Sequence, residues 1–255
     1  MRYYPFLIFP LLLLSGPACK KSETGRHNLL FESGFEGTPG SFLNEWTNDE
    51  HCCDYSVQQS TLAREGKNSV RLEVRDTDPI VSSSIRSELT MLQDYDAGER
   101  WYGFSIYLEN WDNDPAGEHV FQWHPESSSG SAVLSLFTNE NNFTLVHQNG
   151  GSTSSQEFAR PVLGPLLKNQ WVDFVLHVKW AADDSGLLEI WLNGAKKYTY
   201  NGRTDWGGQY IKMGINKFCW AGPCGPSAVS VRVMYIDAFR IGNEKATYND
   251  VKPGS

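Results

Sequence analysis

Short runs in which apolar and polar residues alternate fill most of the chain, and clusters of Gly, Asn, Asp, Ser and Pro separate them. Alternation with a period of two is typical of β-strands, and helical periodicity is nearly absent. The clearest strands are predicted at residues 69–75, 101–108, 120–124, 132–138, 171–180, 187–192, 210–215 and 229–241. This pattern predicts an all-β fold built of two facing antiparallel sheets.

A turn signal supports this interpretation. Asn193 and Gly194 directly follow the run 187–192, and an Asn-Gly pair supplies the positive φ angles that a tight hairpin turn needs. The sequence contains no internal repeat, and a β-sandwich of this length often forms one domain. We therefore expect a single domain over residues 29–255.

The N-terminus has the organisation of an export signal. Arg2 precedes an apolar run over residues 6–14, which is too short to span a bilayer, and small residues lead to Cys19. Residues 1–18 are thus predicted to be a signal peptide, and Cys19 stands where bacterial lipoproteins are acylated. Residues 19–28 would form a lipid-anchored tether, which places the protein at the outer membrane, on its periplasmic or cell-surface side. The alternative is a plain secretory peptide with an incidental cysteine.

Charge and cysteine content narrow the choice of function. The net charge is −8, which argues against a nucleic-acid partner because such domains carry a basic surface. Four cysteines remain besides Cys19, at positions 52, 53, 219 and 224. In an exported protein an even number favours disulfides, and adjacent Cys52 and Cys53 are poorly placed to chelate one zinc ion together. The pairing stays open.

Three of the alternating runs, within residues 84–89, 121–124 and 210–216, place apolar residues on one face and reactive polar groups on the other. The polar faces carry Arg86, Glu88, Gln122, His124, Tyr210, Lys212 and Asn216. For any single strand, an ordinary solvated face is the better interpretation. On neighbouring strands, however, these residues would form a groove that holds cations, an amide and an imidazole, which is a plausible active-site inventory.

Such a set suits removal of the proton next to a uronic acid carboxylate, followed by expulsion of the 4-linked sugar oxygen. Arg86 and Gln122 would donate to the carboxylate and stabilise the charge that grows there in the transition state. His124 would accept the proton as a neutral imidazole. Tyr210 or Lys212 would protonate the leaving oxygen, and this chemistry requires no cofactor.

At these residues the sequence resembles the jelly-roll polysaccharide lyases, namely family seven alginate lyases, heparin lyase I and glucuronan lyases. Residues 86–89 resemble their R-S-E-L motif, residues 122–124 their Q-x-H motif and residues 210–214 their Y-x-K-x-G motif. The resemblance implies a concanavalin A-like β-jelly-roll sandwich with a concave substrate groove. It also implies that Arg86 and Gln122 neutralise the substrate carboxylate. Trp123 is more similar to heparin and glucuronan lyases, so a glucuronan-like polymer is favoured over alginate or heparin.

One position departs from these families, which continue the third motif to a second tyrosine that acts as catalytic acid. Here that position is Asn216, and an amide cannot transfer a proton at neutral pH. Tyr107, Lys217, Tyr210 and Lys212 are the candidates for a replacement. A non-catalytic carbohydrate-binding jelly-roll protein is the alternative function. A laminarinase-like hydrolase ranks last, because the sequence has no E-x-D-x-x-E strand to supply its two carboxylates.

The protein is expected to be a monomer whose partner is an acidic polysaccharide. Further residues are predicted to contact this substrate. The predicted substrate contacts are Glu88, Asn216, Lys217, Tyr107 and His51, the last if a disulfide pins its loop at the groove. The resemblance to calcium-braced jelly rolls suggests a structural calcium ion bound by Asp237 with Glu32 or Glu36. The alternative interpretation is that these three carboxylates are ordinary surface acids.

Overall fold

The structure, a computed structural model, describes residues 28–254 except 40, 92–96, 127–129, 153–154, 223 and 225–226. The predicted signal peptide 1–18 lies outside the described residues, as does the predicted tether apart from its last residue, so export and lipid anchoring stay predictions. Among the described helices, none is both long enough and apolar enough to cross a bilayer.

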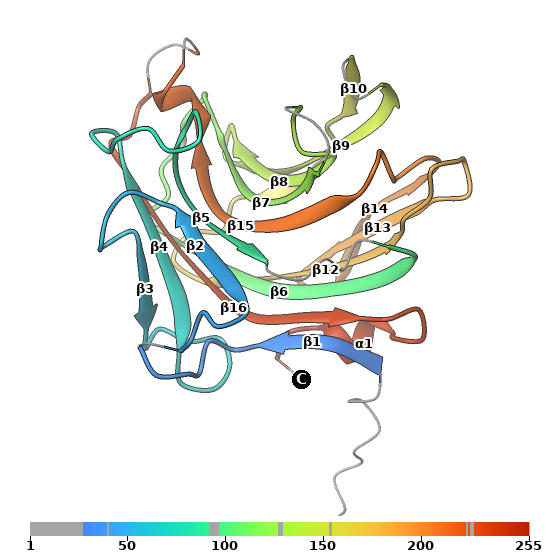
Figure 1. Cartoon of the computed structure of the whole chain (residues 1–255), viewed down its shortest axis with the longest axis horizontal. Coiled ribbons are helices and arrows are strands. Elements are labelled where there is room, and N and C mark those ends of the chain that lie inside the picture. Colours follow the sequence, from blue (N-terminus) through green and yellow to red (C-terminus); the bar gives the residue numbers. More distant parts are fainter. Residues whose placement is uncertain are drawn as a thin grey trace, which may run out of the picture.

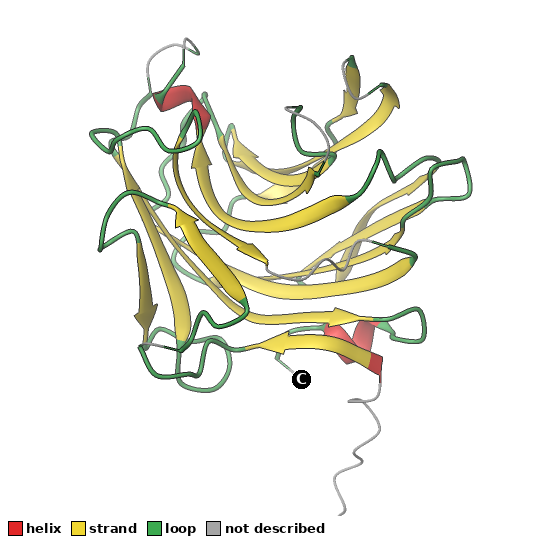
Figure 2. Cartoon of the chain, in the orientation of Figure 1, coloured by secondary structure: helices red, strands yellow, loops and turns green. Residues whose placement is uncertain are grey.

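Two antiparallel sheets face each other across the core, and helical segments are short (Figures 1 and 2). In the outer sheet the order is β14 (Ala195–Asn201), β13 (Leu187–Leu192), β12 (Trp171–Lys179), β6 (Glu99–Glu109), β16 (Val231–Gly242), β4 (Ser69–Arg75) and β3 (Val57–Ser60), with β1 (Leu29–Ser33) also paired to β16. Two short helical segments occur late in the described chain, η2 (Phe218–Trp220) and α1 (Tyr248–Val251).

The second sheet is curved, with its concave side turned upward in Figure 1, and we call it the concave sheet. Its order is β10 (Gln156–Ala159), β9 (Asn142–Gly151), β8 (Leu134–Asn139), β7 (Glu118–Pro125), β15 (Gln209–Lys217), β5 (Ile85–Met91) and β2 (Trp46–Glu50), with β11 (Val162–Pro165) also paired to β9. The predicted β-jelly-roll sandwich is confirmed.

Aromatic residues join the two sheets. Phe104 of β6 stacks on Phe121 of β7 with ring centroids 4.2 Å apart, and Phe239 of β16 lies 5.9 Å from Phe121. All three side chains are fully buried. Each such burial contributes about 1.5–3 kcal/mol. Since Phe121 points into the core, its neighbour Gln122 faces the concave side.

The alternating pattern located the long strands well. Residues 69–75 and 187–192 form β4 and β13 with the predicted bounds, and the other six predicted runs all contain strands. The predicted hairpin joins β13 to β14, with φ of 47° at Asn193 and 82° at Gly194. Shorter strands such as β2 have mostly polar sequences, so alternation did not reveal them.

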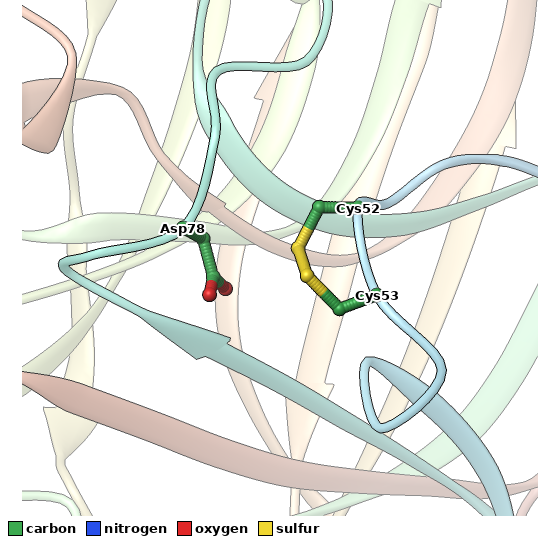
Figure 3. Close-up of side chains that lie close together, drawn as sticks. All are labelled: Cys52, Cys53 and Asp78. Atoms are coloured by element: carbon green, nitrogen blue, oxygen red, sulfur yellow. A yellow bond between two sulfur atoms is a disulfide. The ribbon is translucent and has the colours of Figure 1, made fainter.

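The cysteines form two local disulfides, Cys52–Cys53 and Cys219–Cys224, which confirms the expectation of disulfides. One cluster of potential metal ligands occurs in the described part of the chain, made of Cys52, Cys53 and Asp78 (Figure 3). Both sulfurs of this cluster are bound to each other, so it offers no thiolate ligand for zinc.

Gly214 allows β15 to approach β5 closely. It pairs directly with Glu88 and has a φ of 140°. A Cβ atom at this position would lie 2.1 Å from the carbonyl oxygen of Ser87 and 2.7 Å from the Cα of Glu88. Only glycine fits without displacing the backbone, which gives a structural reason for the glycine at the end of the Y-x-K-x-G run.

We therefore predict that Gly214→Ala lowers the free energy of unfolding by about 2 kcal/mol or more, because the positive φ and the backbone clash add together. Gly222→Ala is the matched control, since the nearest atom to a Cβ there is 3.5 Å away. Urea denaturation of both variants measures the effect. Equal stability of the two would contradict this account of Gly214.

Candidate active site

The predicted groove exists on the concave sheet, where β7, β15 and β5 lie side by side. Their register pairs Tyr210 with His124, Lys212 with Gln122, and Asn216 with Arg86. A pocket of about 410 Å³ opens over these strands, lined by Arg86, His119, Gln122, His124, Gly130, Ser131, Ala132, Phe137, Val146, Phe158, Arg160, Asn216 and Phe218. The fold thus brings the three predicted polar runs together.

Glu88 lies at the centre of the groove floor and has no exposed surface. One of its oxygens accepts a hydrogen bond from the Gln122 amide, and the other is 3.2 Å from Arg86 Nη1 and 3.4 Å from Lys212 Nζ. The expectation that Glu88 contacts the substrate is wrong, because its partners cover it completely. It instead holds three side chains in place.

Glu50 of β2 is a second carboxylate in the floor, and it was not predicted because its strand is short and mostly polar. Its Oε2 lies 2.9 Å from Arg86 Nη1 and also forms an ion pair with Lys212. Burial alone would raise the pKa of Glu50, but the hydrogen bond and charge of Lys212, together with Arg86, hold it below the usual value. Glu50 is therefore ionised at neutral pH.

Lys212 lies beneath the groove surface. Its side chain is 2% exposed, and its ammonium group is engaged by Glu50 and Glu88. A cation held between two carboxylates is poorly placed to reach a leaving oxygen. The position favours a role in ordering the floor over the predicted role of proton donor.

The guanidinium of Arg86 has one nitrogen that bonds to no protein group in the described chain. Its Nη1 meets Glu50 and Glu88, and its Nη2 donates to the carbonyl oxygen of Ser82 at 2.9 Å. Its Nε is buried and has no hydrogen-bond partner within the described chain. Although Nε is shielded from solvent, the Arg86 side chain is 11% exposed and lines the pocket, so the guanidinium is suited to a ligand oxygen there.

His124 lines the pocket, and Tyr210, which is not among the lining residues, pairs with it across β7 and β15. Nδ1 of His124 lies 3.2 Å from the carbonyl oxygen of Pro125, a contact in which the ring must donate, so Nε2 carries the lone pair. Burial lowers the pKa of His124, Lys212 lowers it further, and the imidazole is neutral near pH 7. Burial raises the pKa of Tyr210, whose ring centroid is 5.4 Å from that of His124, so the phenol keeps its proton.

His119 also lines the pocket, which the alternation did not predict. Counting back from Phe121 puts it on the core face, but the strand register shifts between His119 and Phe121 and turns the ring outward. Its Nδ1 lies 3.0 Å from Ser135 Oγ. Burial, with a contribution from Arg160, lowers its pKa to about 3, so it is neutral at physiological pH.

Asn216 faces the pocket as predicted, between Arg86 and His119 in the register. Its Oδ1 accepts a hydrogen bond of 2.5 Å from Ser84 Oγ, which orients the amide nitrogen as the group available to a ligand. His51 is not among the residues that line this pocket, and its expected contact with the substrate stays a prediction. Its Nδ1 is buried without a partner.

The prediction that Tyr107 serves the groove is wrong. Tyr107 belongs to β6 in the outer sheet, where it pairs with Trp171. Its ring lies 5.7 Å from that of Trp171 and 5.6 Å from that of Tyr235. On β6 the even-numbered residues, such as Phe104, point into the core between the two sheets. Tyr107 is on the opposite face of the strand, so its side chain points away from the concave sheet.

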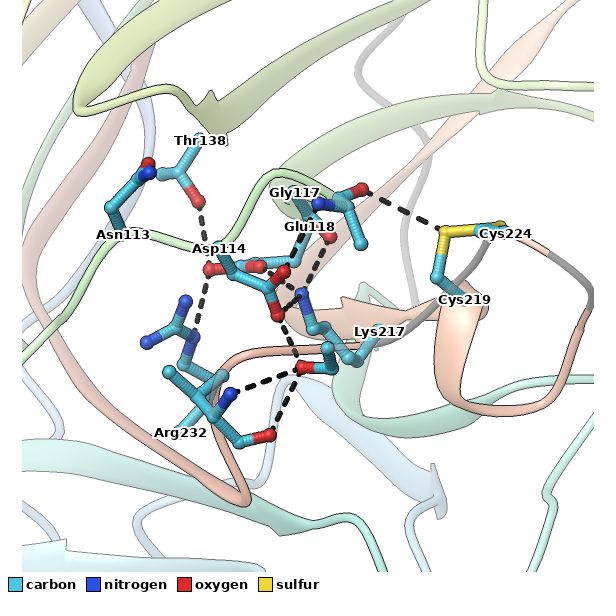
Figure 4. A network of polar contacts seen from close by, with 12 residues as sticks. Asn113, Asp114, Gly117, Glu118, Thr138, Lys217, Cys219, Cys224 and Arg232 are labelled. Carbon is cyan, nitrogen blue, oxygen red and sulfur yellow. Dashed lines mark hydrogen bonds and ion pairs between the residues drawn. A yellow bond between two sulfur atoms is a disulfide. The ribbon is translucent and has the colours of Figure 1, made fainter.

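The prediction for Lys217 is also wrong. Its ammonium has no exposed surface and lies 2.8 Å from Asp114 Oδ2 and 2.6 Å from Glu118 Oε2, within a network that includes Arg232 (Figure 4). On β15 it shares the inward face with Ile215. Two carboxylates compensate the charge of the buried Lys217 ammonium, and this ammonium cannot reach a substrate in the groove.

The three carboxylates expected to bind calcium are occupied by protein donors. Glu32 pairs with Arg240 at 2.8 Å, Glu36 accepts the Lys67 amide at 2.7 Å, and Asp237 accepts the Arg64 amide at 2.6 Å. They do not form a cluster of metal ligands in the part of the chain that the structure describes. The arrangement does not fit a ready-made calcium site, and the ion stays a prediction.

Comparisons with known proteins place this geometry in context. A family model described as polysaccharide lyase matches residues 39–240. The endo-beta-1,4-glucuronan lyase of the fungus Trichoderma reesei is 20% identical with a TM-score of 0.68, over 82% of this chain and 98% of that one. No curated protein shows significant sequence similarity to the chain.

Two further structures share the fold. Family 7 alginate lyase A1-II′, in complex with substrate, is 12% identical with a TM-score of 0.57, over 80% of this chain and 96% of that one. The catalytic domain of the glycoside hydrolase family 131 protein from Coprinopsis cinerea is 15% identical with a TM-score of 0.59, over 86% and 96%. Because a hydrolase is among them, the fold alone does not decide the chemistry.

The pKa of His119 predicts how stability depends on pH. Between about pH 3 and 6.5 the unfolded chain binds a proton at this residue and the folded chain does not, so stability falls as the pH drops below 6.5. The loss amounts to at most about 1.4 kcal/mol per pH unit. We predict that His119→Gln, measured by urea denaturation at pH 7 and pH 5, loses less stability than the wild type. Parallel losses in both proteins would contradict the burial of this ring.

Proposed function

Since the chain belongs to the polysaccharide lyase family, we propose that it cleaves an acidic, uronate-containing polysaccharide by β-elimination at the pocket of the concave sheet. The observation that carries the proposal is the meeting of two groups in this pocket. Arg86 presents a partly exposed guanidinium to the pocket, and His124 presents a neutral imidazole nitrogen. A uronate supplies a carboxylate for the first and an acidic C–H for the second.

The proposed reaction starts with the substrate carboxylate bound by the guanidinium of Arg86, which lines the pocket. Gln122 uses one amide hydrogen on Glu88 and has the other for the same carboxylate. These donors stabilise the negative charge that develops as the proton leaves C5. Nε2 of His124 takes that proton, the electron pair forms the C4–C5 double bond, and the C4–O bond breaks.

Tyr210 is the proposed proton donor to the leaving oxygen. Its phenol keeps its proton at neutral pH and lies beside His124. Of the other candidates from the sequence, Tyr107 belongs to the outer sheet, Lys217 is fully buried and Lys212 is engaged by two carboxylates.

A glucuronan-like polymer is the proposed substrate. The Trp123 in the Q-x-H run resembles the glucuronan and heparin lyases, and the glucuronan lyase has a higher TM-score than the alginate lyase among the compared structures. The groove floor contains the carboxylates of Glu50 and Glu88, which pair with its cations. Such a floor favours a polymer with one carboxylate per sugar over a densely sulfated polymer.

Asn216 favours a second candidate function, a carbohydrate-binding protein that does not cut. It stands where the resembling families place their acidic tyrosine. Both functions use the same groove, and only the catalytic one produces a new double bond.

We predict that His124→Ala and Arg86→Ala each reduce cleavage of polyglucuronate by at least about 10²-fold, because both side chains line the pocket. His124→Ala should leave the fold intact, whereas Arg86→Ala also removes a partner of the buried Glu88 and should lower stability. Cleavage is followed by the ultraviolet absorbance of the C4–C5 double bond, with circular dichroism to check folding. Neutral glucans are the substrate control and should remain uncut. Full activity of either variant, or preference for a neutral glucan, would overturn the proposal.

For the proton donor, we predict that Tyr210→Phe lowers kcat by roughly 10²–10⁴-fold with little change in KM, since the phenol oxygen acts in the chemical step. Full turnover of this variant would mean that His124 or water protonates the leaving oxygen. Asn216→Tyr distinguishes the second candidate function. Cleavage by that variant, with an inactive wild type, would identify this chain as a binding protein.

A further inference from the structure

The pocket contains one cation that lies outside the three polar runs. Arg160 follows β10 and precedes β11, and it lines the same pocket as His119 and Arg86. Its side chain is exposed. Within the described residues its side chain forms no ion pair or hydrogen bond, and its guanidinium carbon lies 5.9 Å from the centroid of the Phe158 ring.

This sets Arg160 apart from the cations of the groove floor. Arg86 and Lys212 are matched by the carboxylates of Glu50 and Glu88, so their charges are compensated inside the protein. The charge of Arg160 is not, and it is felt at His119, whose pKa it lowers. An unpaired guanidinium at the edge of a pocket is suited to a carboxylate, which it binds through two parallel hydrogen bonds.

Apolar side chains contribute to the pocket that Arg160 lines. Phe137, Val146, Phe158 and Phe218 line this pocket, and Phe218 keeps 38% of its surface exposed. A pocket that joins apolar walls to a few placed polar groups is the usual form of a small-molecule subsite. The walls offer a surface to a sugar ring, and Arg160 offers a partner to an acid carried by that ring.

We propose that Arg160 binds the carboxylate of the uronate next to the one that is cleaved, so that the enzyme selects polymers with consecutive uronates over polymers in which neutral sugars alternate with them. The inference rests on the proposed function, because it takes Arg86 to hold the reacting carboxylate. Arg160 belongs to a loop and not to the catalytic strands, so it contributes to binding and specificity. Its loss should therefore change KM and leave kcat nearly unaltered.

The test compares Arg160→Ala and Arg160→Lys with the wild type on polyglucuronate and on a polymer that alternates glucuronate with a neutral sugar. Lys197→Ala is the charge-matched control, because Lys197 is an exposed lysine on β14 of the outer sheet. For Arg160→Ala we expect KM on polyglucuronate to rise about tenfold, and KM on the alternating polymer to stay within about twofold. Arg160→Lys should recover part of the loss, and Lys197→Ala should behave as the wild type.

Binding of glucuronate oligosaccharides to the His124→Ala variant, measured by calorimetry, distinguishes failure of the proposed function from failure of the role proposed for Arg160. A wild type that neither cleaves nor binds any polyuronate overturns the proposed function and this inference together. A wild type that cleaves polyglucuronate, with Arg160→Ala unchanged on it, overturns the inference alone. So does an equal loss on both polymers, which would indicate a general effect of charge. Weaker oligosaccharide binding on removal of Arg160 supports it.

Discussion

The arrangement of the groove depends on the burial of one carboxylate, Glu88. A carboxyl group without exposed surface is costly to bury unless donors surround it, and here Arg86 of the same strand, Gln122 of β7 and Lys212 of β15 do so. A shift of one residue in any of the three strands would turn its donor into the core. The ion cluster therefore fixes the register of β7, β15 and β5, and Gly214 lets the last two approach.

The same carboxylates set the electrostatics of the chemistry. Glu50 and Glu88 compensate the charges of Arg86 and Lys212, so the floor holds its donors rigidly without a strong positive field. At His124, Lys212 and Arg86 lower the pKa while Glu88 raises it, and the larger effect of burial keeps the ring neutral. A neutral imidazole and a protonated phenol can thus stand side by side at the same pH, as elimination requires.

Alternation predicted the long strands and the faces of Arg86, Gln122 and His124, because side chains in a regular strand change sides at every residue. Alternation did not predict the side-chain direction where the strand is irregular, and it could not predict which strands pair in the folded chain. The register shift beside His119 reverses its face. The alternating run around Tyr107 does not show which of the two sheets it joins. The carboxylate partners of Lys217 are Asp114 and Glu118, about a hundred residues earlier in the chain, at the start of β7 and in the loop before it. Arg160 lies outside any strand and gives no periodic signal.

The change at Asn216 has a stereochemical consequence if Tyr210 is the acid. Positions 210 and 216 share a face of β15 but lie six residues apart, paired with His124 and His119 respectively, and of the two only Asn216 lines the pocket. With the donor at 210, proton removal and protonation of the leaving oxygen both occur from the side of His124, where the two ring centroids are 5.4 Å apart. An adjacent base and acid suit an elimination in which the C5 hydrogen and the C4 oxygen lie on the same face of the sugar. Glucuronate has that configuration and guluronate does not, so the site and the proposed substrate are consistent with each other.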